Sequence, residues 1–274
     1  MTTGANAAAN LEQATALVHH AADRGATYIQ LPEYAAFWGP ERLLRGGAQT
    51  LDGPFITAMA TIARERDVTV HVGSFLEQGD GVLRNTSVVL HPSGQRAVYR
   101  KLHLFDVEIP DGIVYRESAL ITPGHEMIVN VAASLTLGLT ICFDLRFPEL
   151  YRALSVAGAN VLCVPSAFSA VTGPAHWDVL LRARAIENGA FVLAAAQAGT
   201  TPEGVSTHGH ALIVDPWGTA LAESSTDGPE VLVATIDLDV VEDRRRHINT
   251  LALRRPALYN GVVTRVVDQA VEPR

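Results

Sequence analysis

The sequence predicts an α/β protein built from two related halves. Apolar helical patterns alternate with short apolar strand patterns, and the same order of elements occurs twice along the chain. In each half a helix leads through Gly-Ala to a strand that ends at a proline, and a second helix, a second strand and a hairpin follow. We expect a four-layer α-β-β-α sandwich of two pseudo-symmetric halves, with a single doubly wound sheet as the alternative.

The first half begins with a helix. Apolar residues from Leu11 to Ala22 recur at helical spacing, and Asn10 with Gln13 has the pattern of a capping box. The strand in GATYIQLPEY then ends at Pro32. Residues 54–66 predict a second helix with proline at its first position, and the strand VTVHVGSF and the hairpin SVVLHPSGQRAVYRK follow.

The second half repeats this order. Helical spacing over residues 150–157 leads to GANVLCVPSA, and residues 176–188 predict a helix closed by Gly189, before the strand FVLAAAQ and the hairpin ALIVDPWGTALAE. A strand, LTLGLTI, also precedes the first helix of this half, and the first half has no counterpart. We therefore expect that a strand ahead of Met1 is missing, through truncation or divergence, and that residues 1–274 form a single domain.

Composition and charge limit the classes of partner. The formal net charge of −8 argues against nucleic acids and anionic membranes. No apolar run reaches the roughly 18 residues of a membrane helix, and MTTGANAAAN has no pattern of a secretory signal. The two cysteines lie in apolar runs, which favours a reducing, cytoplasmic environment over a disulfide framework.

Cys142 lies at a junction that suits a nucleophile. It ends the strand LTLGLTI, a tight turn follows, and Pro148 with Glu149 begins a helix. Nearby helix N–H groups are expected to lower the thiol pKa and to hold a developing oxyanion. The alternative is a buried filler thiol, which is our interpretation of Cys163, because no such junction surrounds it.

A thiol nucleophile needs a base, and no histidine adjoins Cys142 in the sequence. His103, His176 and His210 are possible remote partners. Glu33 is the other choice, since it follows Pro32 at a strand end that matches the end at Cys142, although an exposed loop acid is the commoner role of a single glutamate.

Four motifs together carry a resemblance to a known family. LPEY, YRKLHLFD, RES and ICFDLRFPELYR resemble the carbon–nitrogen hydrolase (nitrilase) superfamily, from Asn10 to about Tyr259. The resemblance implies the α-β-β-α fold, a Glu-Lys-Cys triad at Glu33, Lys101 and Cys142, and an assisting second glutamate at Glu117. It also implies hydrolysis of a linear amide through a cysteine thioester without a cofactor, and an oxyanion held by Lys101 and the N–H of Phe143.

Further motifs resemble the branch that cleaves amides of 2-oxoglutarate. KLHLFDVEIP, PSAFSAVTGPAHWDVLLRARAIE and GHALIVDPWG favour a deaminated glutathione amidase, with an omega-amidase acting on 2-oxoglutaramate as the alternative. Such substrates carry a carboxylate, for which Arg146 is the candidate clamp and Thr172 an added hydroxyl contact. Arg146 could equally form an ion pair with Glu149 or Asp144. An N-carbamoyl or aliphatic amide hydrolase and an inactive scaffold of the same fold remain open.

Other motifs predict no additional function. His208 and His210 in THGHA have a spacing that zinc sites use, but no third ligand with suitable spacing is evident, so we expect no metal site. The basic run at Arg244 to His247 is typical of a solvated helix face. By resemblance to the family, the tail from about residue 250 is expected at the interface of a homodimer or larger homo-oligomer.

Overall fold

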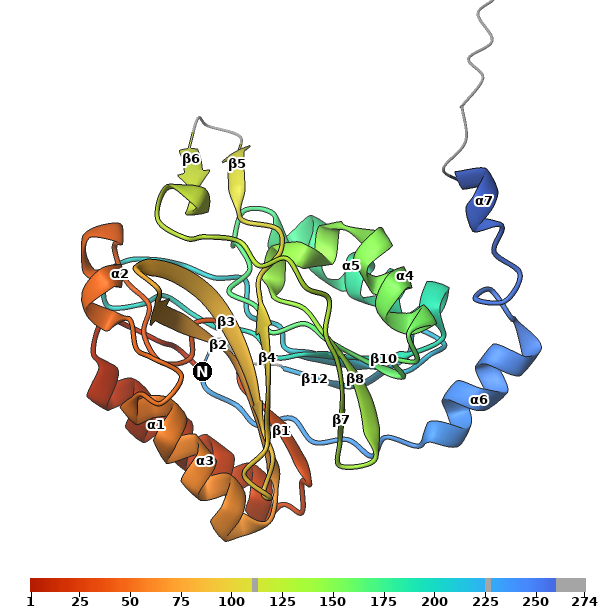
Figure 1. Cartoon of the computed structure of the whole chain (residues 1–274), viewed down its shortest axis with the longest axis horizontal. Coiled ribbons are helices and arrows are strands. Elements are labelled where there is room, and N and C mark those ends of the chain that lie inside the picture. Colours follow the sequence, from red (N-terminus) through yellow and green to blue (C-terminus); the bar gives the residue numbers. More distant parts are fainter. Residues whose placement is uncertain (110–112, 225–227, 260–274) are drawn as a thin grey trace, which may run out of the picture.

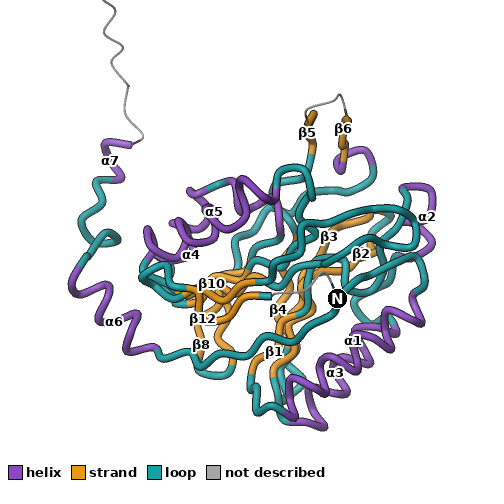
Figure 2. The backbone as a smooth tube through the Cα atoms, turned by 180° about the vertical axis from the view of Figure 1, so that it is seen from behind, coloured by secondary structure: helices purple, strands orange, loops and turns teal. Residues whose placement is uncertain are grey.

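The computed structural model describes residues 1–109, 113–224 and 228–259 (Figure 1). Their strands form a four-stranded sheet, a six-stranded sheet and a two-stranded hairpin. Helices α1 and α3 lie along the four-stranded sheet on one side of the molecule, and α4 and α5 lie along the six-stranded sheet on the other (Figures 1 and 2). The predicted mixed α/β class is confirmed.

The four-stranded sheet belongs to the first half of the chain. Its order is β1-β2-β3-β4, with β1 parallel to β2 and the other neighbours antiparallel. The elements of this half are α1 (Ala7–Asp23), β1 (Tyr28–Gln30), α2 (Glu41–Gly47), α3 (Pro54–Arg66), β2 (Thr69–Gly79), β3 (Val82–Leu90) and β4 (Arg96–Arg100).

The start of α1 differs from the prediction. The helix begins four residues before Leu11, and Asn6 caps it by accepting a hydrogen bond from the N–H of Ala9 at 3.1 Å. Asn10 is buried inside the helix, where its amide donates to the carbonyls of Gly4 and Ala36. The predicted capping box at Asn10 is therefore wrong, because this asparagine ties the N-terminal loop to the loop after β1.

The six-stranded sheet belongs to the second half. Its order is β12-β11-β10-β9-β8-β7, in which β9 is parallel to both β8 and β10 and the other neighbours are antiparallel. The elements are β7 (Val129–Ala132), β8 (Leu135–Leu139), the 3-10 helix η3 (Cys142–Arg146), α4 (Pro148–Val156), β9 (Val161–Cys163), α5 (Gly173–Asn188), β10 (Phe191–Ala194), β11 (Leu212–Val214) and β12 (Ala220–Glu223).

The remaining elements lie outside the two sheets. They are the hairpin strands β5 (Asp106–Ile109) and β6 (Ile113–Arg116), the 3-10 helix η2 (Glu117–Ala119), α6 (Leu238–His247) and α7 (Pro256–Tyr259). The end of the tail predicted at an oligomer interface, residues 260–274, lies outside the described residues. Of the helices described, none is long and apolar enough to cross a bilayer.

The two sheets meet where β1 faces β9 and β10. The Tyr28 hydroxyl lies 3.3 Å from the sulfur of Cys163, and the Gln30 amide donates to the Leu193 carbonyl at 3.0 Å. One apolar cluster lies within the first half, and the cluster of the second half extends to Val89 and Tyr99 of the first sheet. Because the sheets are joined at the strands that lead into the loops after Pro32 and Pro165, those loops lie close together.

Candidate active site

The structure brings the four predicted catalytic residues together. The ammonium of Lys101 lies 3.0 Å from Oε1 of Glu33 and 2.9 Å from Oε2 of Glu117. The relative exposure is 1% for Glu33, 2% for Lys101 and 8% for Cys142. Cys142 belongs to the same group, since the charges of Glu33 and Lys101 both act on its thiol.

Glu33 is positioned by the loop that follows β1. The N–H groups of Tyr34 and Ala35 donate to the hydroxyl and carbonyl oxygens of Ser74, at 2.9 and 2.8 Å. A side chain at Gly73 would place its Cβ 1.9 Å from the Leu31 carbonyl oxygen, so only glycine lets the loop approach β2 this closely. The Glu33 backbone is thereby fixed at the end of β1.

Lys101 follows β4, and its N–H donates to the Asn85 carbonyl on β3 at 2.9 Å. Burial opposes the charge on Lys101, but the carboxylates of Glu117 and Glu33 hold the pKa of this amine well above its usual value. Burial also opposes the charge on Glu117, whereas Lys101 and the N–H of Phe105 lower the pKa of that carboxyl. Lys101 is therefore a cation held between two carboxylates.

Cys142 begins η3, with Thr140 and Ile141 between it and the end of β8. Its backbone has a left-handed φ of 45°, which is unusual for a residue with a side chain, and its N–H donates to the Pro165 carbonyl at 2.9 Å. Asp144 stabilises the turn, because its buried carboxylate accepts from the Ile141 N–H at 2.8 Å and from the Tyr99 hydroxyl at 2.7 Å. This strained backbone conformation therefore fixes the direction in which the thiol projects at the turn after the strand.

The expected low pKa of the Cys142 thiol is wrong. Burial raises this pKa well above the usual value, the charge of Glu33 raises it further, and Lys101 only partly compensates. The prediction considered the helix N–H groups but not the carboxylate that the fold brings beside the sulfur. The resting group is therefore a neutral thiol next to a base, so that the thiol must lose its proton during attack.

The two oxygens of Glu33 have different partners. Oε1 accepts from Lys101 and, at 2.9 Å, from the Asn85 amide, while Oε2 accepts from the Ala167 N–H at 2.7 Å. These three contacts hold both oxygens of the Glu33 side chain in place beside the thiol. Acid, amine and thiol together have the composition needed for nucleophilic attack with a neighbouring base and a cation for the oxyanion.

The three predicted substrate-binding residues also lie together. The guanidinium of Arg146 is 3.2 Å from the Thr172 hydroxyl and lies over the Phe143 ring at 5.9 Å. Arg146 is half-buried and forms no ion pair with a carboxylate of the described residues, so the alternative pairing with Glu149 or Asp144 does not occur. The described contacts also give the N–H of Phe143 no acceptor.

The sequence interpretation missed two residues that contact the carboxylates. Asn85 donates to Glu117 at 3.1 Å as well as to Glu33, and the hydroxyl of Tyr34 donates to Glu117 at 2.8 Å. Asn85 lies among four consecutive polar residues of β3, Arg84 to Ser87, so the sequence gives no signal that separates it from its neighbours or identifies its partners.

The three histidines considered as remote bases have other partners. The ring of His103 pairs with Asp144 at 2.8 Å, and that of His176 lies 3.2 Å from the Arg146 guanidinium. The ring of His210 lies beside His208, and its backbone carbonyl accepts from the Trp177 indole. Within the described ranges, no group of three or more histidine, cysteine or acidic residues has the arrangement of a metal site.

Comparisons with known proteins agree with this geometry. The family model for carbon-nitrogen hydrolase matches residues 2–246. A deaminated glutathione amidase of Synechocystis is 42% identical over 93% of this chain and 95% of its own length, and the omega-amidase NIT2 of Mus musculus is 35% identical over 91% of each. The crystal structure of the C. elegans NitFhit protein superimposes with a TM-score of 0.89 at 34% identity, covering 95% of this chain and 64% of that longer one.

Proposed function

The chain belongs to the carbon-nitrogen hydrolase family, and on that basis we propose that it hydrolyses a linear amide through a thioester on Cys142. The observation that carries the proposal is the buried contact between Lys101 and Glu33 beside the Cys142 thiol. The inactive scaffold is disfavoured, since burying three ionisable groups together costs stability without a function.

The first half-reaction acylates the cysteine. Sγ of Cys142 attacks the amide carbon while Glu33 accepts the thiol proton. The oxygen of the tetrahedral intermediate becomes an anion, held by the Lys101 ammonium and the Phe143 N–H, each contributing about 3 kcal/mol. The C–N bond then breaks as Glu33 returns the proton to the leaving amine, and a thioester remains.

The second half-reaction releases the acid. Water attacks the thioester carbon and gives a proton to Glu33. The second tetrahedral intermediate then collapses to the carboxylic acid as the C–S bond breaks, and Glu33 returns the proton to the sulfur of Cys142. Glu117 keeps Lys101 charged and oriented through both steps, because its carboxylate also contacts the ammonium, at 2.9 Å. The proposed chemistry requires no metal ion or organic cofactor.

We further propose a substrate that carries a carboxylate, most simply a 2-oxoglutarate amide such as deaminated glutathione. Arg146 supports this. Among the described residues its half-buried guanidinium forms hydrogen bonds only with Thr172 and His176, so N–H donors remain for bidentate binding of a carboxylate. The relatives named deaminated glutathione amidase support the same class, and the relative named omega-amidase supports 2-oxoglutaramate as the second candidate.

A coupled assay of 2-oxoglutarate release tests this proposal. Deaminated glutathione and 2-oxoglutaramate are compared with an N-carbamoyl amino acid, whose hydrolysis is followed by ammonia release, and Cys142→Ala is the control protein. We expect the highest kcat/KM with deaminated glutathione and no turnover by the variant. Turnover of the N-carbamoyl compound alone would overturn the substrate assignment, and no turnover of any amide would support the inactive scaffold.

The finer architecture is also a proposal. We propose that the halves form a four-layer α-β-β-α sandwich, supported by the repeated order α1-β1-α3-β2-β3-β4 and α4-β9-α5-β10-β11-β12. In the second half β8 precedes this order, and the described part of the first half has no equivalent strand. A homo-oligomer with the C-terminal tail at its interface remains a prediction, which light scattering of the full chain and of a chain ending at residue 250 would test.

A further inference from the structure

Tyr34 directly follows the proposed base Glu33 and has a strained backbone. Its φ of 56° lies in the left-handed region, which is unusual for an aromatic residue. The N–H of Tyr34 donates to the Ser74 hydroxyl at 2.9 Å, and its ring stacks on Trp38 with the ring centroids 6.0 Å apart. Backbone strain of this kind persists where surrounding contacts impose it and is concentrated at active sites, so the direction of this side chain calls for a functional reason.

The Tyr34 hydroxyl reaches the charged groups of the site. It donates to Oε1 of Glu117 at 2.8 Å. Burial and the charge of Glu117 raise the pKa of Tyr34 well above its usual value, so the hydroxyl keeps its proton and always acts as the donor. The charges of Lys101 and Glu33 act on the same phenol.

Glu117 comes from a different part of the fold. It begins η2 directly after the hairpin strand β6, outside the two larger sheets. Its N–H donates to the Phe105 carbonyl at 3.3 Å, and its Oε2 accepts from the Phe105 N–H at 2.7 Å, so this oxygen is fixed to the start of the same hairpin. Oε1 accepts from Tyr34 and, at 3.1 Å, from the Asn85 amide, both of which belong to the first half. Tyr34 therefore links the carboxylate of the hairpin to the loop that carries Glu33.

The surroundings of Glu117 have to compensate for its burial. Burial opposes the charge on Glu117, yet the pKa of its carboxyl lies below its usual value, because nearby donors and a cation favour the ionised form. The described groups that face this carboxyl are Lys101 after β4, Asn85 on β3, the N–H of Phe105 ahead of β5 and Tyr34 after β1. The Tyr34 hydroxyl makes the shortest of the contacts to Oε1, and its loss would leave the Asn85 amide and a 3.3 Å contact with Lys101.

We propose that Tyr34 is a positioning residue for the amide hydrolysis, whose hydroxyl holds Glu117 in place as a carboxylate so that Lys101 stays charged and directed at the developing oxyanion. This inference rests on the proposed function, in which Lys101 stabilises that oxyanion. In this role Tyr34 acts through Glu117 and not on the substrate. The strained turn after Glu33 thus fixes the base and, through the next residue, the second carboxylate.

Tyr34→Phe removes the hydroxyl and keeps the ring that stacks on Trp38. For deaminated glutathione we expect kcat to fall about tenfold with little change in KM, since one hydrogen bond to a charged group is lost. The acid limb of the kcat/KM profile should move up by about one pH unit, because Glu117 loses a donor that favours its ionised form. A merely structural role of the hydroxyl would lower the Tm and the activity without moving this limb.

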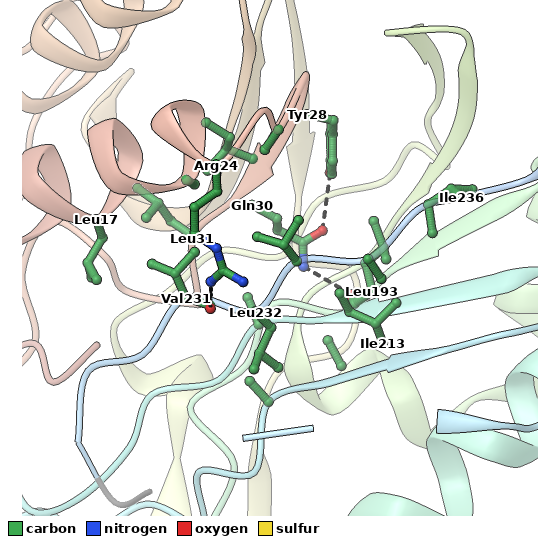
Figure 3. Close-up of a pocket in the computed structure, with 18 of the residues that line it drawn as sticks. Leu17, Arg24, Tyr28, Gln30, Leu31, Leu193, Ile213, Val231, Leu232 and Ile236 are labelled. Carbon is green, nitrogen blue, oxygen red and sulfur yellow. Dashed lines mark hydrogen bonds between the residues drawn. The ribbon is translucent and has the colours of Figure 1, made fainter. Parts of the chain in front are cut away.

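Tyr28→Phe is the matched control. The Tyr28 hydroxyl is also partly buried, but it bonds to Gln30 and His71 rather than to a carboxylate (Figure 3). This variant also loses one hydroxyl from β1 and its following loop, so its Tm measures the cost of such a loss to the fold. Its kcat should change less than about twofold, and the acid limb should stay where it is in the parent protein.

A double-mutant cycle with Glu117→Gln shows whether Tyr34 acts through Glu117. In the Glu117→Gln background no carboxylate remains to be held, so Tyr34→Phe should lower the residual kcat by less than about twofold. Equal losses from Tyr34→Phe in both backgrounds would overturn the proposal, because the hydroxyl would then act independently of Glu117.

A direct titration separates this proposal from the proposed function. In protein containing glutamate labelled with carbon-13 at the side-chain carboxyl, NMR follows each group, and Glu117→Gln identifies the Glu117 signal by its loss. That signal should titrate about one pH unit higher in Tyr34→Phe and at the parent value in Tyr28→Phe. An unchanged Glu117 titration in Tyr34→Phe would overturn the proposal even if the enzyme is active. A parent protein that hydrolyses no amide would overturn the proposed function, and the titration would still show whether Tyr34 holds Glu117 ionised.

Discussion

Replacing Arg146 by glutamine should reduce hydrolysis of substrates with a carboxylate far more than hydrolysis of neutral amides. The variant keeps one hydrogen-bonding group near Thr172 but loses the charge and the planar pair of donors. Burial lowers the pKa of Arg146 without removing its charge at neutral pH, and among the described residues no carboxylate neutralises it. The guanidinium is therefore available for an anion.

The size of the effect follows from the lost contacts. Two hydrogen bonds to a charged group contribute about 1.5 kcal/mol each where the group is half-buried, or about 3 kcal/mol together. That free energy corresponds to a decrease in kcat/KM of roughly 100-fold. The neutral comparison substrate is 2-oxoglutaramate with its carboxylate converted to the methyl ester, for which the same variant should lose less than about threefold.

Steady-state kinetics of both substrates with the parent protein and Arg146→Gln gives the four values required. Arg152→Gln is the matched control, since Arg152 is also half-buried but bonds to the Glu187 carbonyl away from the cysteine. Equal losses for the acid and the ester would refute the reasoning, because Arg146 would then act on the shape of the site rather than on the carboxylate.

Three further predictions concern the base, its support and acid stability. Glu33→Gln keeps the shape of the base but cannot accept a proton, so kcat should fall by about 10³-fold or more, while intact mass and Tm show a folded protein. Asn85→Leu removes one donor from Glu33 and one from Glu117, and kcat/KM should fall roughly 10- to 100-fold. Asn130→Leu, at a partly buried asparagine that bonds to His91 instead, should not change it, and equal losses would contradict the role of Asn85. Burial lowers the pKa of His71 to about 3, so between pH 7 and 5 the unfolded chain takes up a proton at this site that the folded chain does not. Stability should therefore fall by about 2 kcal/mol over that interval, and urea denaturation at both pH values should show a smaller fall in His71→Gln; an equal fall would exclude His71 as the cause.

Local sequence signals predict much of the fold. The prolines after two apolar strands mark the strand ends that carry Glu33 and Ser166, and Pro54 and Gly189 mark a helix start and a helix end that the structure confirms. The short strands β5, β6 and β7 were missed, because four residues are too few to establish a period and their pairing depends on partners elsewhere in the chain. The cap of α1 was misplaced because asparagine occurs at both Asn6 and Asn10, and burial alone distinguishes them.

The candidate site was also predictable from the sequence only in part. Glu33, Lys101 and Cys142 each follow a strand, so the strand pattern predicts that they gather at one edge. Asn85 lies inside a strand, where the sequence does not show which groups its amide meets. The direction of the Cys142 pKa depends on burial and on Glu33, which is 109 positions away in the sequence, and no local pattern contains that information.

The central claim is that Glu33, Lys101 and Cys142 act together to form an acyl enzyme. Rapid acid quench during the first turnover of 2-oxoglutaramate, followed by peptide mass mapping, tests it most directly. The account predicts an added acyl mass on the peptide that contains Cys142, removable by hydroxylamine and absent from Cys142→Ala. Undiminished turnover by Cys142→Ala, or an acyl mass on the fully buried Cys163 instead, would contradict it.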